Sequence, residues 1–303
     1  MSGGTSPTGA IAFRPSGRIV AWLILAGAFA FQIPVRRAID RMGASAGATP
    51  AVSYVTSGEW LRRASLGYEG LLADVYWTRA VQYYGAERLS PNPRFGLLSS
   101  LLRITTTLDP HLLAAYRFGA IFLAEKPPAG AGHPEEAMQL LRRGITANPG
   151  EWRLWEDLGF IEYWDLRDYP AAARIFQAGS ERPGAEIWMK ALAAAVAARG
   201  GELQTSRILW SQIYRTAQTA SIRRSALEHL AAIQASEEIR ALNGILAAFQ
   251  RTEGRAALSF SEVVAAGFLR KSPRDPGGAP FVVGADGHVH LGPASHIDLR
   301  LVE

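Results

Sequence analysis

The sequence contains no cysteine among its 303 residues. Without a thiol there is no disulfide, no thiolate nucleophile, no covalent c-type haem attachment and no cysteine-based zinc site. The sequence also has no HExxH metalloprotease motif and no GxxxxGK[ST] phosphate-binding loop. We therefore expect no catalytic residues and no cofactor, and a binding function becomes the leading hypothesis.

Lysine is nearly absent as well: it occurs at three positions, Lys126, Lys190 and Lys271. The formal net charge of +5 therefore comes from arginines, which are scattered among aspartates and glutamates with no basic run longer than a pair. Such mixed charges are typical of solvated helix faces, whereas a nucleic-acid-binding protein gathers its cations into a patch or stripe. We expect no nucleic-acid partner.

A long apolar run is present near the N-terminus. Residues 19–31 read IVAWLILAGAFAF, and seventeen residues separate Arg18 from Arg36. At 1.5 Å per residue, this length is at the short limit of a helix that crosses about 30 Å of hydrocarbon. We expect residues 1–18 to be a polar tail and residues 19–35 a membrane helix. A cleaved signal peptide and a buried core helix are the alternatives.

The orientation of this span is less strongly determined. A short N-terminal tail followed by one span is typical of a signal anchor that exports the rest of the chain. The count of flanking arginines slightly favours the opposite orientation. We expect a single-pass protein of a bacterial inner membrane with its body in the periplasm.

The body of the chain is predicted to be all-α. Residues 36–58 are small and polar and indicate a linker. In residues 59–255 apolar side chains recur every three or four positions, and alanine and leucine are abundant. Helices of about a dozen residues between turn signals predict an array of antiparallel helix pairs.

The turn signals are also periodic. Pro110, Pro149 and Pro183 are separated by 39 and 34 residues, and a period near 34 is that of a two-helix repeat. In the repeat that begins at residue 152, one residue is inserted before Asp168. Its helix-packing positions hold Trp155, Leu158, Gly159, Ala172 and Phe176. By these residues and this spacing the chain resembles the tetratricopeptide-repeat family over roughly residues 65–250.

The resemblance implies a right-handed superhelical solenoid that binds an extended peptide or a helix along its concave groove. The family's groove-facing positions, carried onto this sequence, include Arg79, Gln82, Tyr116, Arg153, Glu156, Phe160, Tyr163 and Met189.

The last part of the chain, residues 256–303, changes character. Ser259 to Glu262 has the spacing of a capping box and predicts a short helix. Asp286-Gly287 between two apolar runs predicts a β-hairpin. We expect the short helix and the hairpin to cap the open end of the solenoid.

His288 and His290 are weak metal-ligand candidates, because residues two apart on a strand share one face. A surface hairpin with exposed imidazoles gives the same pattern without a metal.

These observations favour a non-catalytic, membrane-anchored scaffold that recruits protein partners in an envelope assembly. The alternatives are an accessory subunit of a larger membrane complex, and a metal-binding enzyme with its site near the hairpin.

Overall fold

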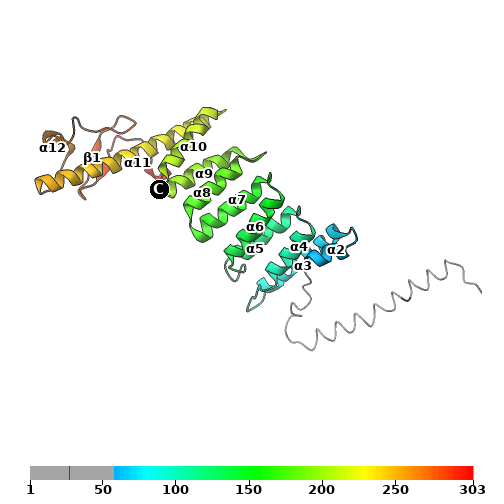
Figure 1. The fold of residues 1–303 in the computed structure, drawn as a ribbon. Helices are drawn as coiled ribbons and strands as arrows, with labels where there is room; N and C mark the ends of the chain where they lie inside the picture. The colour runs from blue at the N-terminus through cyan, green and yellow to red at the C-terminus, as the bar shows by residue number, and fades with distance from the viewer. Residues whose placement is uncertain (1–26, 28–57, 303) are drawn as a thin grey trace, which may run out of the picture. The chain divides into compact units, whose positions relative to one another are not determined.

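The computed structural model describes residue 27 and residues 58–302 of the chain. These residues form eleven α-helices (Figure 1): α2 (Gly58–Ala64), α3 (Glu69–Arg88), α4 (Leu98–Leu108), α5 (Leu113–Ala124), α6 (Pro134–Ala147), α7 (Trp152–Ile161), α8 (Tyr169–Ser180), α9 (Ile187–Arg199), α10 (Leu203–Thr216), α11 (Ala220–Glu253) and α12 (Phe260–Ala265). A π-helix, η1 (Glu162–Leu166), directly continues α7. Two strands, β1 (Phe281–Val283) and β2 (Val289–Leu291), and a 3-10 helix, η2 (Leu299–Leu301), complete the chain.

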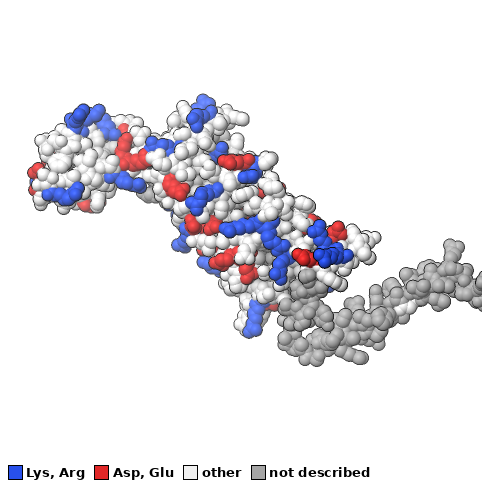
Figure 2. Space-filling view, viewed as in Figure 1, with Lys and Arg blue, Asp and Glu red and all other residues white. Residues whose placement is uncertain are grey.

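The predicted helical body is confirmed, and its helices pack in chain order. Each helix from α3 to α10 contacts the next one, and α5 also contacts α7, the helix after next (Figure 1). The described residues 58–302 lie in one compact unit. On the face shown in Figure 2, basic and acidic side chains are intermixed over this unit.

Helix starts follow from local chemistry. Helix α6 begins with Pro134, which lacks the N–H that would have no partner there, and has Glu135 and Glu136 in its first turn. Helix α8 is capped by the Asp168 carboxylate, which accepts a hydrogen bond from the Ala171 N–H at 2.9 Å. The turn signals seen in the sequence thus place the helix boundaries.

Two glycines inside helices allow close packing between helices. A methyl group on Gly159 of α7 would lie 2.5 Å from Cε1 of Phe176 on α8. At Gly179 of α8 it would clash with the Met189 side chain of α9. Since a real Cβ does not approach another atom so closely, these positions require glycine for the observed spacing of the helices.

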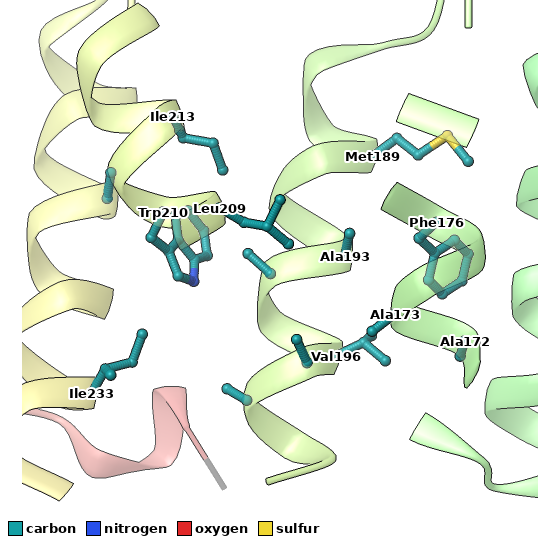
Figure 3. Close-up of a cluster of buried hydrophobic side chains, with 14 of the residues drawn as sticks. Ala172, Ala173, Phe176, Met189, Ala193, Val196, Leu209, Trp210, Ile213 and Ile233 are labelled. Atoms are coloured by element: carbon teal, nitrogen blue, oxygen red, sulfur yellow. The ribbon is translucent and has the colours of Figure 1, made fainter. Parts of the chain in front are cut away.

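The largest core cluster lies between α7 and α11 (Figure 3). Phe176 of α8 and Met189 of α9 are fully buried in it, and Trp210 of α10 and Ile233 of α11 join it from the other side. Burial of each such side chain contributes roughly 1.5–3 kcal/mol. This cluster joins the last two predicted repeats to α11.

Helix α11 differs from the sequence prediction. The predicted array of antiparallel helix pairs implies two helices here, but residues 220–253 form one continuous helix of 34 residues. No proline or glycine occurs between Ala220 and Asn243, so nothing in this stretch interrupts the helix. The helix ends at Gly254, whose φ of 71° is that of a left-handed C-cap.

The predicted hairpin is confirmed at the C-terminus. Strands β1 and β2 pair antiparallel, with Phe281 opposite Leu291. Phe281 and Val289 are buried against Leu242, Leu246 and Phe249 in the second half of α11. The hairpin therefore covers apolar side chains of α11.

No helix within residues 58–302 is both long and apolar enough to cross a membrane. The predicted tail and linker, except Gly58, and the predicted span, except Gly27, lie outside the described residues.

Candidate partner-binding groove

The eight predicted groove residues fall into three groups by exposure. Arg79 and Gln82 of α3 and Arg153 of α7 are exposed. Glu156, Phe160 and Tyr163 are half-buried. Tyr116 and Met189 are 1% and 0% exposed, so the prediction that these two side chains face a groove is wrong.

The reason for their burial is a glycine on the neighbouring helix. A methyl group on Gly144 of α6 would lie 2.8 Å from Cδ1 of Tyr116, so this ring lies directly over the glycine. Met189 lies in the same way over Gly179 of α8. In both cases the large side chain fills the space that the glycine leaves, and it points into the core.

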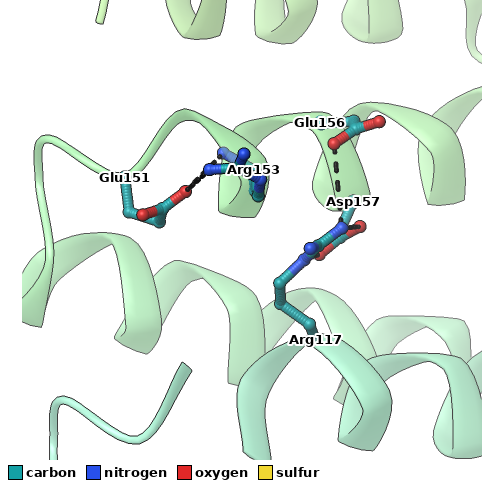
Figure 4. A network of polar contacts seen from close by, with 5 residues as sticks. All are labelled: Arg117, Glu151, Arg153, Glu156 and Asp157. Carbon is teal, nitrogen blue, oxygen red and sulfur yellow. Dashed lines mark hydrogen bonds and ion pairs between the residues drawn. The ribbon is translucent and has the colours of Figure 1, made fainter. Parts of the chain in front are cut away.

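An ion-pair network joins the exposed sides of α5 and α7 (Figure 4). Arg117 Nε and Nη2 donate to Oδ2 and Oδ1 of Asp157 at 2.6 and 3.0 Å, and Glu156 Oε2 lies 3.7 Å from Arg117 Nη2. Burial and the neighbouring Asp157 raise the pKa of Glu156, while Arg117 and Arg153 oppose this shift. The bidentate geometry fixes the two helices side by side.

A pocket of about 350 Å³ lies beside this network, between α5 and the α7–η1 segment. Its lining is mostly apolar: Ala120, Ile121 and Ala124 from α5, Phe160 and Ile161 from α7, and Trp164 from η1, with the carboxylates Glu125, Asp157 and Asp165. Of the predicted groove residues, only Phe160 lines it. Ile121 and Trp164 are 44% and 67% exposed, which is unusual for such large apolar side chains.

The π-helix shapes one wall of the pocket. The sequence has one residue more than the repeat pattern before Asp168, and the chain absorbs it as the wider turn Glu162–Leu166. Arg167 ends this turn in the left-handed region, with a φ of 56°. Single-turn π-helices of this kind are frequent at functional sites.

The charged side chains that line the pocket are all acidic. Burial is the main cause that raises the pKa of Asp165, nearby Glu125 adds to the shift, and Lys126 opposes it. Asp157 is paired with Arg117, but Glu125 and Asp165 have no ion pair among the contacts of residues 58–302. The pocket is therefore an apolar hollow with an acidic rim.

Tyr163 belongs to a different contact. Its hydroxyl accepts a hydrogen bond from Arg199 Nη1 at 2.8 Å, and the Arg199 guanidinium lies 5.8 Å from its ring centroid. Its ring also packs edge-on against Trp164, with centroids 4.7 Å apart. Tyr163 thus connects η1 to α9, and its ring packs against Trp164.

The histidine pair of the hairpin does not gather further ligands. His288 and His290 are both exposed, and His290 Nε2 lies 3.0 Å from both carboxylate oxygens of Asp286. Hydrogen bonds from the His288 N–H and the His290 ring lower the pKa of Asp286. Within the described part of the chain, no group of three or more histidine, aspartate or glutamate side chains is placed to hold a metal ion.

The sequence analysis missed most of the pocket's lining, namely Ile121, Glu125, Asp157, Trp164 and Asp165, and also Arg117, which pairs with Asp157 beside the pocket. No protein-family model matches the chain, and the comparisons with curated proteins and with solved structures found no match.

Proposed function

We propose that the chain is a non-catalytic, membrane-anchored scaffold of the tetratricopeptide type, which holds a protein partner in the pocket between α5 and α7. The observation that carries this proposal is the apolar pocket itself, with two large apolar side chains, Ile121 and Trp164, exposed at its edge. Exposed apolar surface of this kind costs solubility, and it is typical of sites that a partner covers.

Two further observations support the proposal. The helices pack consecutively, as in repeat proteins, whose neighbouring units bury each other's apolar faces. The pocket lies between α5 and α7. By the repeat pattern both would be first helices of a repeat, and the tetratricopeptide family binds its ligands along such helices. Residues 19–35 would place this scaffold at the periplasmic face of a bacterial inner membrane.

Site-specific photo-crosslinking in the cells that make the protein tests the proposal. A photoreactive amino acid replaces Ile121 in one variant and Ile208 in the control, which is 58% exposed on α10, a helix that does not line the pocket. We expect one protein to be crosslinked from position 121 and not from position 208. No adduct at position 121, or the same adducts at both positions, would contradict a partner in this pocket.

A further inference from the structure

We propose that the pocket receives a bulky apolar side chain of a protein partner, and that a lysine or arginine next to that side chain meets the acidic rim. This inference rests on the scaffold function proposed above and specifies the chemistry of its partner.

The apolar part of the pocket has small residues on one side and an aromatic ring on the other. Ala120 and Ala124 are one turn apart on α5 and form a floor of small residues, and Phe160 stands opposite them on α7. The volume of about 350 Å³ equals that of about twelve waters at roughly 30 Å³ each. Water in such an apolar hollow gains little from its surroundings, so an apolar side chain that displaces it gains free energy.

The rim determines the charge of the partner. Glu125 and Asp165 line opposite helical segments, α5's C-cap and η1, and neither is neutralised by a direct ion pair among the described contacts. The Tyr84 hydroxyl is 3.4 Å from Glu125, and the charge of Lys126 acts on Asp165 without a direct ion pair.

The neighbouring network does not cancel this charge. Arg117 is held by Asp157 and Glu156, so its positive charge is already matched by two carboxylates. The pocket lining thus holds three carboxylates, Glu125, Asp157 and Asp165, and the cations that pair with or act on them are Arg117 and Lys126. A cationic partner group is attracted by this excess, whereas an acidic one is repelled.

Burial adds to the preference for a cation. The Asp165 carboxylate has lost part of its hydration, which is why its pKa is raised. A lysine or arginine of the partner would restore favourable contacts to the ionised carboxylate. A partner segment with an aromatic or aliphatic residue beside a basic one would therefore fit both the apolar hollow and the acidic rim.

Selection from a display library of random peptides of about twelve residues tests the inference with the full chain in detergent micelles. The enriched peptides are then synthesised, and their affinity is measured by fluorescence anisotropy. We expect the enriched sequences to share an aromatic or large aliphatic residue next to lysine or arginine.

Variants assign the binding to the pocket. We expect Trp164→Ala to weaken binding by about tenfold, since it removes the exposed apolar wall. We expect the double variant Glu125→Lys with Asp165→Lys to weaken it by about tenfold as well, and to bind better when the basic residues of the peptide are replaced by glutamate. Ile208→Ala and Glu181→Lys, changes of an exposed isoleucine and an exposed carboxylate elsewhere, are the controls and should leave the affinity unchanged.

The outcomes separate this inference from the scaffold function. If neutral or acidic peptides bind and Trp164→Ala abolishes their binding, the inference of a basic partner is wrong, but the proposed binding of a protein partner in this pocket stands. A library that yields no binding peptide, or peptides insensitive to all pocket variants, would overturn both. Thermal melting of each variant, followed by circular dichroism, shows whether a loss of affinity comes from unfolding.

Discussion

Adding a single methyl group at Gly159 is expected to push helices α7 and α8 apart. In Gly159→Ala the added Cβ would lie 2.5 Å from the buried ring of Phe176, which cannot move without disturbing the core. Overpacking of this kind typically costs about 1–3 kcal/mol. We expect the free energy of unfolding, measured by urea titration, to fall by this amount.

Gly244→Ala is the matched control for this prediction. Gly244 is exposed in the middle of α11 and has no atom within 4 Å of the added methyl group. Alanine is favoured over glycine inside a helix by up to about 1 kcal/mol, so this variant should be more stable than the parent. Equal effects of the two substitutions would contradict close packing at Gly159.

Glu162 gives a prediction of pH dependence. Its side chain is buried in η1, and burial, with a further contribution from Asp168, raises its pKa. A raised carboxyl pKa means that the folded protein binds the proton more tightly than the unfolded chain. The corresponding stability is present at acidic pH and is lost as the pH rises through the folded pKa.

We therefore expect Glu162→Gln, which removes the buried charge and keeps the shape, to raise the melting temperature at pH 7 by a few degrees. The difference from the parent should disappear below about pH 4, where Glu162 itself is protonated. The ion pair with Arg142, at 3.9 Å, opposes the gain, and Arg142 is mostly exposed. A variant less stable than the parent at pH 7 would show that this pair outweighs the cost of burial.

Some of the pocket was predictable from residue spacing. Arg117 and Asp157 each stand two positions before the glycine of their repeat, Gly119 and Gly159, so stacked repeats bring them side by side. Tyr116 and Met189 were not predictable in the same way. Whether such a side chain enters the core depends on the glycine that faces it from a neighbouring helix, and this contact is absent from any local pattern.

At the scale of elements, helix type and hairpin position followed from the sequence, because the apolar period and the Asp286-Gly287 turn are local signals. Two element-level features did not. Because the stretch from Ala220 to Asn243 has no proline or glycine, α11 continues as one helix where the repeat pattern predicts a break between two helices. An extra residue before Asp168 is also compatible with a longer turn, so the sequence alone does not show that a π-helix accommodates it.

The hairpin is expected to stabilise the second half of α11. Phe281 of β1 is 4% exposed and packs with Leu246 and Phe249, and the Val289 N–H donates to Asn243 Oδ1 at 2.8 Å. We expect Phe281→Ala to lower the free energy of local unfolding of this region by about 3–5 kcal/mol, because it opens a cavity in this small core. Hydrogen exchange of α11 amides after residue 240 should accelerate, while α5 to α8 keep their protection.

Val282→Ala is the control for the hairpin. Val282 is next to Phe281 in the same strand but is 37% exposed, so its truncation should leave the exchange of α11 nearly unchanged. Faster exchange throughout α5 to α8 in Phe281→Ala would instead mean that the whole unit unfolds cooperatively.

At the scale of the whole molecule, the cores follow the order of the chain. One cluster is built mainly by α3 to α7, a second by α7 to α11, and a third by the end of α11 with residues 257–291. Helices α3 to α11 contact chiefly their neighbours in sequence. Local contacts of this kind are typical of repeat proteins, whose stability is close to a sum of unit and interface contributions.

The proposed membrane anchor gives a prediction for the complete chain. Residues 19–31 are uninterruptedly apolar, and Leu25 stands near the middle of the stretch between Arg18 and Arg36. An arginine at the centre of a membrane helix costs roughly 2.5–3.5 kcal/mol of insertion free energy. We expect the parent to stay with the membranes after an alkaline wash, and a large part of Leu25→Arg to appear in the soluble fraction.

The mass of the parent protein provides the control, since a cleaved signal peptide would shorten the chain by roughly 30 residues. A full-length chain that is soluble in the parent as well would contradict the anchor, and with it the placement of the pocket at a membrane.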